Sequence, residues 1–442
     1  MRNFTFKGLF LTAVFILLGC LSIQAADDDL ITKQITIKLD KAGTLPDRIT
    51  SSKKYKITNL KIIGEINGTD FRMIREMAGS DYYGGSTEGN LSVLDLSEAK
   101  IVIGGGDCFN GYSCYTSNDV IGNRAFSGCS RLTSLTLPAS ITRIGDDAFC
   151  CCSGLTSLTL PAGITEIGYG AFWGCSGLTS LNLPAGITSI GDDAFYGCSG
   201  LTSITLPAGI TEIGGSAFNG CSRLTSLTLP AGITSIGGGA FYGCSGLTSL
   251  NLPAGITEIG GGAFGFCSGL TSINLPAGIT SIGEYAFYGC SGLTSVTLPA
   301  GITEIGECAF YGCSGLTSLT LPASLTQIDD YAFSECSGLT SIYVYAEKVP
   351  KIGEDVFTGC DAKKCTVYVP KGTYDDYWLS DFRNYFENIV EFDATGIDKT
   401  TTSTDVKEVS RYSVNGQRLV GPTKGLNIVK YSDGSVKKVA VE

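Results

Sequence analysis

Histidine is absent from all 442 residues of the chain, and this absence excludes several kinds of chemistry. Without an imidazole there is no histidine general acid or base, no Ser-His or Cys-His nucleophile pair and no histidine metal ligand. Lysine is missing from Ile101 to Glu347, and between Arg131 and Cys336 three arginines stand against thirteen acidic residues. The formal net charge is −11. Because phosphate binding needs clustered cations, we expect neither nucleic acid nor an anionic membrane as a partner.

Long apolar runs are scarce, and the one that stands out lies at the N-terminus. Two basic residues precede the apolar run from Gly8 to Cys20, and the small pair Ala25-Ala26 follows it. This pattern predicts a secretory signal peptide over residues 1–26, too short and wrongly flanked for a membrane anchor. The letters LLGC that end at Cys20 also resemble a lipobox, so lipidation of Cys20 stays open as an alternative to cleavage near Ala25. No other segment approaches the ~18 apolar residues of a transmembrane helix, so we expect an exported chain without a membrane span.

Glycine is abundant, with 59 residues, and much of it belongs to a repeat of 23 residues. The pair Ala-Phe recurs ten times at this spacing, and a degenerate copy, Val356-Phe357, follows after 24 residues. The unit reads I-G-x-x-A-F-x-G-C-S-G-L-T-S-L-x-L-P-A-G-I-T-x. The runs Leu-Thr-Ser-Leu-x-Leu and Ile-Thr-x-Ile have a period of two, which is typical of short strands, and glycine-containing turns separate them. One unit is too small to close a core, so the repeat predicts a solenoid whose stacked units share one core.

The unit L-x-x-L-x-L-P-x-x-[IL]-x-x-I-x-x-x-A-F-x-x-C resembles the BspA-type bacterial leucine-rich repeat, also called the Treponema pallidum type. This resemblance implies a leucine-rich repeat solenoid with 23-residue coils and short parallel strands over residues 120–370. Family members are typically surface or secreted proteins, and several are adhesins. The resemblance therefore implies non-covalent binding of, or adhesion to, a host or microbial protein or glycan. We expect no cofactor and no enzyme activity. A structural spacer without a ligand is the alternative, and a glycan-active enzyme is a more distant one.

Both ends of the array differ from the repeat, and we expect them to cap its core. Residues 27–119 are predicted to form an N-terminal cap with an insert and one helix after Thr69-Asp70. Residues 371–394 are predicted to form a C-terminal cap with a helix rich in Trp, Tyr and Phe. Residues 395–408 have the composition of a polar linker, and residues 409–442 that of a small β tail with Asn-Gly, Lys-Gly and Asp-Gly turns. The tail resembles sorting modules of Bacteroidetes secreted proteins, which implies surface association through this tail or through a lipidated Cys20.

One cysteine recurs in every unit, and we expect this column to be structural. The side chains should stack as free, buried thiols, because the chain has no histidine, and no lysine from Ile101 to Glu347, to activate them. In the insert, Cys108 and Cys114 are a candidate disulfide pair in an oxidising compartment. The run from Cys150 to Cys152 is not expected to bind a metal, because adjacent cysteines cannot all face one ion.

Three columns vary between units and hold the candidate ligand-binding residues. The first is an aromatic column two residues before the column cysteine, where rings could contact protein or sugar or could only shield the turn. The second is the variable residue of Ile-Thr-x-Ile, where glutamate and serine alternate through seven coils, and a weak cation or ligand strip stays open there. The third is the small, hydroxylic face of Ser-Leu-x-Leu. The candidates are Trp173, Tyr196, Tyr242, Tyr288 and Tyr311 in the first column, Glu166, Glu212, Glu258 and Glu304 in the second, and Asn182, Asn251 and Asn274 in the third.

Overall fold

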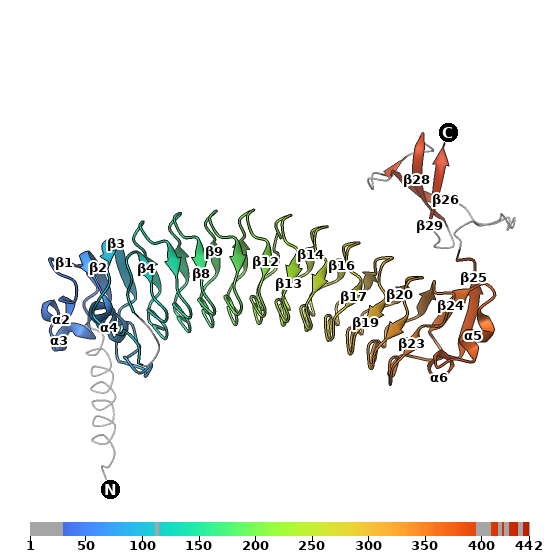
Figure 1. Ribbon diagram of the computed structural model, residues 1–442, viewed down its shortest axis with the longest axis horizontal. Coiled ribbons are helices and arrows are strands. Elements are labelled where there is room, and N and C mark those ends of the chain that lie inside the picture. Colours follow the sequence, from blue (N-terminus) through green and yellow to red (C-terminus); the bar gives the residue numbers. More distant parts are fainter. Residues whose placement is uncertain are drawn as a thin grey trace, which may run out of the picture. The chain divides into compact units, whose positions relative to one another are not determined.

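A computed structural model divides the chain into two units, Met1–Phe392 and Asp393–Glu442, which are described separately. The structure describes residues 30–110, 115–394, 408–413, 418–419, 424–431 and 436–441. The expected signal peptide with Cys20, the expected linker and Cys114 therefore lie outside the described residues, apart from Glu408 at the linker's end. In the first unit the chain turns once every 23 residues, and the coils stack side by side in chain order (Figure 1). This arrangement confirms the predicted solenoid.

The Ser-Leu-x-Leu runs form one face of the solenoid, which we call the strand face. Neighbouring strands pair in parallel with a register of one repeat, so that Leu181 lies opposite Ile204. Because side chains alternate along a strand, Leu181 is buried while Ser180 and Asn182 on either side are exposed. The strands of this face in the repeats are β5 (Ser134–Thr136), β7 (Ser157–Thr159), β9 (Ser180–Asn182), β11 (Ser203–Thr205), β14 (Ser249–Asn251), β16 (Ser272–Asn274), β18 (Ser295–Thr297), β20 (Ser318–Leu321) and β22 (Ser341–Val344).

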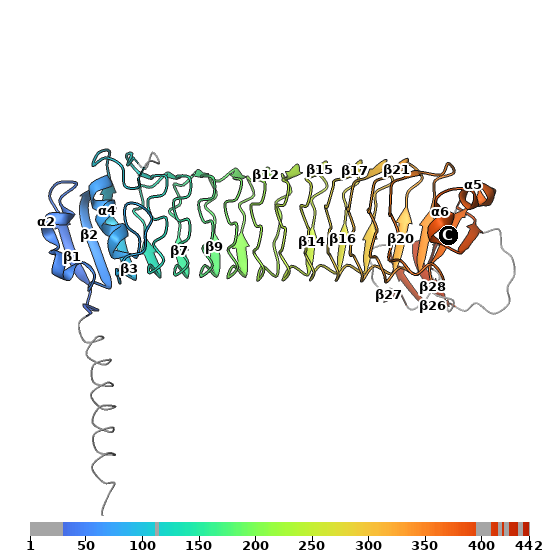
Figure 2. The ribbon, with the colours of Figure 1, turned by 90° about the horizontal axis from the view of Figure 1, so that it is seen from below.

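The Ile-Thr-x-Ile runs form a second parallel ladder on another side of the coils, as the view in Figure 2 shows. Each of its strands has two residues, of which the isoleucine points into the core and the variable residue points out. These strands are β4 (Val120–Ile121), β6 (Arg143–Ile144), β8 (Glu166–Ile167), β10 (Ser189–Ile190), β12 (Glu212–Ile213), β13 (Ser235–Ile236), β15 (Glu258–Ile259), β17 (Ser281–Ile282), β19 (Glu304–Ile305), β21 (Gln327–Ile328) and β23 (Lys351–Ile352).

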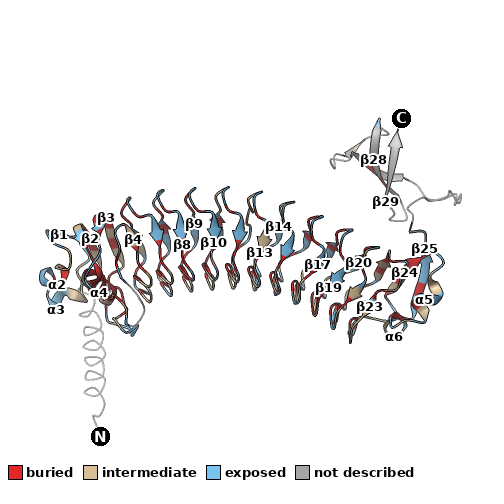
Figure 3. Ribbon diagram, in the orientation of Figure 1, coloured by how far each residue is buried: buried red, intermediate tan, exposed pale blue. Residues whose placement is uncertain are grey.

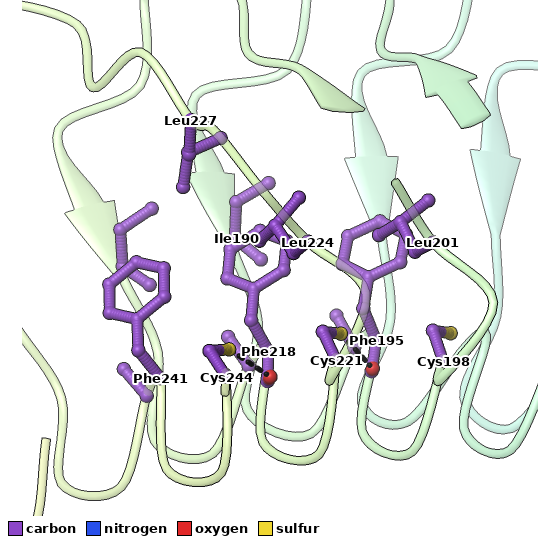
Figure 4. Packing of buried hydrophobic residues seen from close by; sticks show 14 of the residues in the cluster. Ile190, Phe195, Cys198, Leu201, Phe218, Cys221, Leu224, Leu227, Phe241 and Cys244 are labelled. Atoms are coloured by element: carbon purple, nitrogen blue, oxygen red, sulfur yellow. Dashed lines mark hydrogen bonds between the residues drawn. The ribbon is translucent and has the colours of Figure 1, made fainter. Parts of the chain in front are cut away.

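The core is built from identical residues stacked on one another, and buried residues line the inside of the coils (Figure 3). Successive phenylalanines from Phe126 to Phe357 lie with ring centroids 5.1–5.6 Å apart and ring planes within 8° of parallel. Figure 4 shows three of these rings with the leucine, isoleucine and cysteine side chains around them. Burying each such side chain stabilises the fold by about 1.5–3 kcal/mol. Because each ring packs on copies of itself, the coils must keep a nearly constant spacing.

The closest approach between coils occurs at the glycine of Cys-Ser-Gly-Leu. A Cβ built at Gly200 would lie only 2.2 Å from the carbonyl oxygen of Ser176 in the preceding coil. In two coils arginine stands at this position, as Arg131 and Arg223, and the strand face differs from the repeat in the coil of Arg223. Residues 226–228 of that coil form no strand, and the sheet is interrupted on both sides of them, between β11 and β14. The repeat predicts a strand there, and that prediction is wrong. The backbone hydrogen bond leading into the ladder is long at this coil, with the Thr225 N–H 3.5 Å from the carbonyl of Thr202, against 2.9 Å between Thr202 and Thr179 in the preceding coil.

The interruption at Arg223 is the larger of two on the strand face. Between β18 and β20 the pairing also stops, but both strands persist and each pairs with its other neighbour. On the second ladder, pairing stops between β8 and β10 and between β15 and β17. Among the described repeats, the coil of Arg223 is therefore the one that lacks its strand on this face, whereas the coil of Arg131 keeps its strand, β5.

The N-terminal residues extend the parallel sheet of the strand face and close one end of the core. The expected helix, α4, begins at Gly68, because Asn67 accepts a hydrogen bond from the backbone of Thr69 while Asp70 accepts one from the backbone of Asn67. Phe71 on this helix packs edge to face on Phe126, with ring centroids 5.4 Å apart. The elements are β1 (Ile35–Leu39), α2 (Leu45–Arg48), α3 (Ser51–Lys54), β2 (Asn59–Ile66), α4 (Gly68–Met77) and β3 (Val93–Ile101).

The C-terminal end of the first unit closes the other end of the core in the same way. Phe386 packs edge to face on Phe357, with ring centroids 5.0 Å apart, and the Tyr377 hydroxyl donates to the carbonyl of Ala346 at 2.7 Å. The sequence predicts one aromatic-rich helix here, whereas the structure has two short ones separated by a turn. The elements are β24 (Thr366–Pro370), α5 (Tyr374–Trp378), α6 (Phe382–Tyr385) and β25 (Asn388–Phe392).

The second unit is a small antiparallel sheet, which confirms the predicted β tail. Its strands, in the order β27-β26-β28-β29, are β26 (Glu408–Ser413), β27 (Arg418–Leu419), β28 (Gly425–Tyr431) and β29 (Val436–Val441). Arg411 and Asn427 are buried and hydrogen-bonded at 3.3 Å. Across the described parts of both units, none of the helices is long and apolar enough to cross a membrane.

Candidate functional site

The aromatic column is divided into two groups of rings. Trp173 and Tyr196 form a pair with ring centroids 4.5 Å apart, and Asn219 then takes the column position in the next coil. The second group, which we call the aromatic edge, lies in the turns that follow the second ladder. The aromatic edge comprises Tyr242, Phe266, Tyr285, Tyr288 and Tyr311.

Each ring of the aromatic edge contacts another, so that the group is continuous over four coils. Phe266 packs edge to face on both Tyr242 and Tyr288, with ring centroids 5.3 and 5.2 Å apart. Tyr288 stacks on Tyr311 at 5.0 Å with ring planes 7° from parallel, and Tyr285 lies 5.8 Å from Tyr288. Paired rings hold each other in place, so the group presents a rigid surface.

Phe266 was not among the sequence candidates, because the column position in its coil is Gly265. Its backbone has φ +54°, at a position where most coils have glycine in the same left-handed region. A Cβ at Gly265 would lie 2.6 Å from Cδ2 of Tyr242, and a Cβ at Gly289 would lie 2.9 Å from Cδ1 of Phe266. Both rings therefore lie directly over glycines of the next coil. An aromatic residue at a position that the repeat fills with glycine is the sequence signal that could have identified it.

The aromatic edge is accessible and carries negative charge. The exposed fractions of Tyr242, Phe266 and Tyr285 are 36%, 44% and 40%, which is high for large hydrophobic side chains. The Tyr285 hydroxyl donates to Oε1 of Glu307 at 3.0 Å, and this hydrogen bond raises the pKa of Tyr285 to about 12. Glu284, beside Tyr285 in the chain, is also exposed. With no lysine between residues 101 and 347, this surface suits a neutral or positively charged partner.

The glutamate column lies in register on the outside of the second ladder. Glu212 pairs with Ser235, which in turn pairs with Glu258, so that serines separate the carboxylates. The four candidates, Glu166, Glu212, Glu258 and Glu304, are all exposed. Arg143 is the cation beside this row, with its Nε 3.0 Å from Oε1 of Glu166. The geometry is that of a solvated acidic strip, and it brings no two of these carboxylates onto neighbouring strands.

The asparagine candidates lie exposed on the strand face. Asn251 and Asn274 are opposite each other in neighbouring strands, whereas Asn182 lies opposite Thr205. The sequence did not predict a hollow of about 460 Å³ that lies on this face beside the interruption at Arg223. Its lining includes the hydroxyls of Ser203, Thr205, Ser226 and Thr228 together with Ala208 and Ala231. Hydroxyl groups over an apolar floor could hold a small neutral ligand.

The column cysteines are buried, and their thiols donate hydrogen bonds to backbone carbonyls of the preceding coil. Cys244 donates a hydrogen bond from Sγ to the carbonyl of Phe218 at 3.1 Å, and Cys221 donates to Phe195 at 3.2 Å (Figure 4). The same bond recurs at each column cysteine from Cys152 to Cys336. Burial raises the pKa of these thiols, to about 12 for Cys198 and Cys244. The expectation of free, buried thiols is confirmed.

The remaining cysteine and metal expectations concern the insert and the run at Cys150. Cys108 is disulfide-bonded, and since Cys114 lies outside the described residues, the pairing of these two residues stays a prediction. Within the part of the chain that the structure describes, no group of three or more Cys, Asp or Glu side chains is placed to hold a metal ion.

Comparison with known proteins agrees with this architecture. A family model described as "BspA type Leucine rich repeat region (6 copies)" matches residues 108–222, 167–276 and 257–374, which together are more than half of the chain. The chain belongs to the BspA-type leucine-rich repeat family. The resemblance seen in the sequence is therefore confirmed. None of the curated proteins compared with the chain matches it significantly.

Solved structures of leucine-rich repeat proteins are similar to this BspA-type chain. A leucine-rich repeat protein from Bacteroides ovatus is 26% identical over 78% of this chain and 86% of its own, with a TM-score of 0.53. The Treponema pallidum leucine-rich repeat protein is 26% identical over 47% of this chain and 78% of its own, with a TM-score of 0.33. A leucine-rich cell surface protein from Faecalibacterium prausnitzii is 26% identical over 72% and 91%, with a TM-score of 0.37.

Proposed function

We propose that this BspA-type protein is exported and displayed at the cell surface, where it binds or adheres to a protein or glycan partner without covalent chemistry. The observation that carries the proposal is the aromatic edge, because five packed rings, three of them exposed and two half-buried, are unusual on a surface that needs only to be soluble. Aromatic rings are also the residues that most often dominate binding interfaces.

The aromatic edge fits two kinds of partner. Flat rings such as those of Phe266 and Tyr242 can pack against the apolar face of a sugar or against side chains of a protein. The carboxylates of Glu284 and Glu307 beside them favour a partner that is neutral or basic. Export rests on the leader-like pattern of residues 1–26.

Weak contacts repeated on a rigid scaffold add up when several are made at once. The Trp173–Tyr196 pair lies on the same column as the aromatic edge, two coils before it, and could engage a second copy of the partner's motif. The second contact is then made at a high effective concentration, so that avidity exceeds the affinity of either group. We therefore expect stronger binding to polyvalent partners than to single motifs.

The test is an array of extracellular matrix proteins, mucins and neutral glycans probed with the full-length chain. The chain is used both as a monomer and displayed on beads, since the proposal predicts retention of at least one partner class mainly by the beads. Retention of no partner, even with multivalent display, would show that the protein is a spacer. Release of new reducing ends from any bound glycan would instead show an enzyme and contradict the non-covalent mechanism.

A further inference from the structure

One coil carries two thiols that do not belong to the cysteine column. Cys150 and Cys151 immediately precede the column residue Cys152, and the Sγ atoms of Cys150 and Cys151 lie 3.4 Å apart. Cys150 is half-buried and Cys151 is exposed, and among the free cysteines that the structure describes Cys151 alone is exposed. These two thiols therefore form a close pair at the surface, whereas the other free cysteines that the structure describes are buried or, at Cys360, half-buried.

The backbone fixes the position of Cys151 from both sides. Its φ is +59°, at a position where most coils have glycine, so a side chain here is held in a conformation that costs energy. Its N–H donates to the carbonyl of Trp173 in the next coil at 2.6 Å, and the Cys150 N–H donates to the carbonyl of Asp147 at 3.0 Å. A Cβ at Gly174 would lie 3.5 Å from Sγ of Cys151, so the glycine of the next coil leaves this thiol room.

The pKa of Cys151 shifts in the opposite direction to the pKa values of the column cysteines. The two thiols share a hydrogen bond in which either can be the donor. Donation by Cys150 lowers the pKa of Cys151 below the usual thiol value, although burial and nearby Asp147 act against this. The same bond, with burial, raises the pKa of Cys150. Cys152 is buried and donates to the carbonyl of Phe126 at 3.0 Å, and burial raises its pKa well above the usual value. Cys151 is exposed, whereas Cys150 is half-buried and Cys152 is buried, so Cys151 is the thiol of this run that a substrate in solution reaches first.

We propose that Cys150 and Cys151 form a thiol–disulfide exchange site whose substrates are small-molecule disulfides. The Cys151 thiolate attacks one sulfur of the substrate and forms a mixed disulfide, and the other half of the substrate leaves as a thiolate that takes up a proton. Cys150 then loses its proton and attacks Sγ of Cys151, which releases the second half as a thiol. The sum is two cysteine thiols and one disulfide converted into a Cys150–Cys151 disulfide and two small thiols.

The product is expected to be readily reversible. Adjacent residues have Cα atoms about 3.8 Å apart across a trans peptide, below the usual range for cysteines joined by a disulfide. A bond closed under such strain is more easily reduced than a structural disulfide. The site therefore responds to the balance of thiols and disulfides around the protein and does not hold a permanent cross-link.

The test treats the reduced, folded full-length chain with glutathione disulfide, blocks free thiols in acid and maps the cysteines by mass spectrometry. The wild-type peptide with Cys150 and Cys151 should lose two hydrogens, while column cysteines such as Cys244 stay reduced. In Cys150→Ser the resolving thiol is missing, so glutathione should remain attached to Cys151. In Cys151→Gly, which introduces the glycine that most coils have at this position, Cys150 should stay reduced.

A second readout is the rate of alkylation of each cysteine in the folded chain. Cys151 should react at least about tenfold faster than a column cysteine such as Cys244, because Cys151 is exposed whereas Cys244 is buried and burial raises its pKa. Equal rates for Cys151 and Cys244 would overturn the proposal. The proposal would equally be overturned if Cys150→Ser trapped no glutathione. It would also be overturned if the wild type accumulated the mixed disulfide and never formed the Cys150–Cys151 disulfide.

Discussion

The interior and the turn edge of the same coils differ in how much the repeat varies. Inside, the phenylalanine and cysteine columns recur unchanged from Phe126 and Cys129 to Phe333 and Cys336, because each side chain packs on its own copy. At the turn edge, one position holds Trp, Tyr, Asn, Ser, Gly or Cys. The difference teaches that coil spacing is set by the interior, so the edge can change residue without disturbing the stack. Changes to the interior should therefore cost stability, and changes to the edge should alter binding.

The largest expected effect comes from alkaline pH, which acts on the whole thiol column at once. Burial raises the pKa of Cys244 and Cys290 to about 12, whereas an unfolded thiol titrates near 9. Below pH 9 both states keep the proton, so stability is fully present. Between about pH 9 and 12 only the unfolded chain loses protons, so stability should fall by about 1.4 kcal/mol per pH unit for each thiol.

Urea unfolding at pH 7.5, 9 and 10 measures this slope. A Cys244→Ala, Cys267→Ala variant is the matched control. Its free energy of unfolding should fall less steeply with pH, because two fewer protons are released on unfolding. An identical slope in this variant and the wild type would show that the column thiols do not carry the pH dependence.

A side chain at the close approach between coils should have the next largest effect. A Cβ at Gly292 would lie 2.2 Å from the carbonyl oxygen of Ser268, so Gly292→Arg should cost about 2–4 kcal/mol and open the strand face beside it. Gly301 in the same coil provides a control, because a Cβ there would lie 3.8 Å from its nearest neighbour. Equal losses in the melting temperature for Gly292→Arg and Gly301→Arg would contradict the account of coil spacing.

The reverse change should restore the regular strand face. The coil of Arg223 lacks its strand, whereas the coils with glycine at this position on either side have theirs, so for Arg223→Gly we expect a gain of about 1 kcal/mol and loss of the hollow beside it. Hydrogen exchange at residues 225–228 should slow as the missing ladder forms. Unchanged exchange rates there would mean that Arg223 is not the cause of the interruption.

The smallest effect on stability is expected at the turn edge. Tyr242→Asn introduces the residue that Asn219 already supplies at the same position of the preceding coil. The free energy of unfolding, measured in urea, should change by less than about 1 kcal/mol. A loss as large as that of Gly292→Arg would show that the ring is part of the core, and the separation between interior and edge would fail.

Much of the fold could be predicted because one short unit is repeated. The residue types that recur at each repeat position indicate whether that position is buried or exposed. The period, both ladders, the buried Cys column and the helix at Gly68 follow from letters alone. The missing strand at residues 226–228 could not be predicted, because residues 224–229 read LTSLTL, the same letters as residues 132–137, where β5 forms.

The candidate site was predictable only in part, for a related reason. Column positions identified Tyr242, Tyr288 and Tyr311, but contact between rings depends on backbone direction at φ +54°, which brings Phe266 between two of them. The close pair Cys150 and Cys151 likewise depends on a left-handed residue. Phe266 and Cys151 both occupy positions where most coils have glycine. The repeat pattern therefore gives no information about where their side chains point.

The most direct test of the central claim compares binding by two variants whose replacements come from the chain's own repeats. The edge variant carries Tyr242→Asn, Phe266→Gly, Tyr288→Ser and Tyr311→Ser, and the strand-face variant carries Asn251→Thr and Asn274→Thr. Each is displayed on beads and titrated against whichever partner the array identifies for the wild type. We predict that the edge variant loses at least about tenfold in affinity while the strand-face variant binds as the wild type does. Full binding by a folded edge variant would contradict the claim that the aromatic edge is the recognition surface.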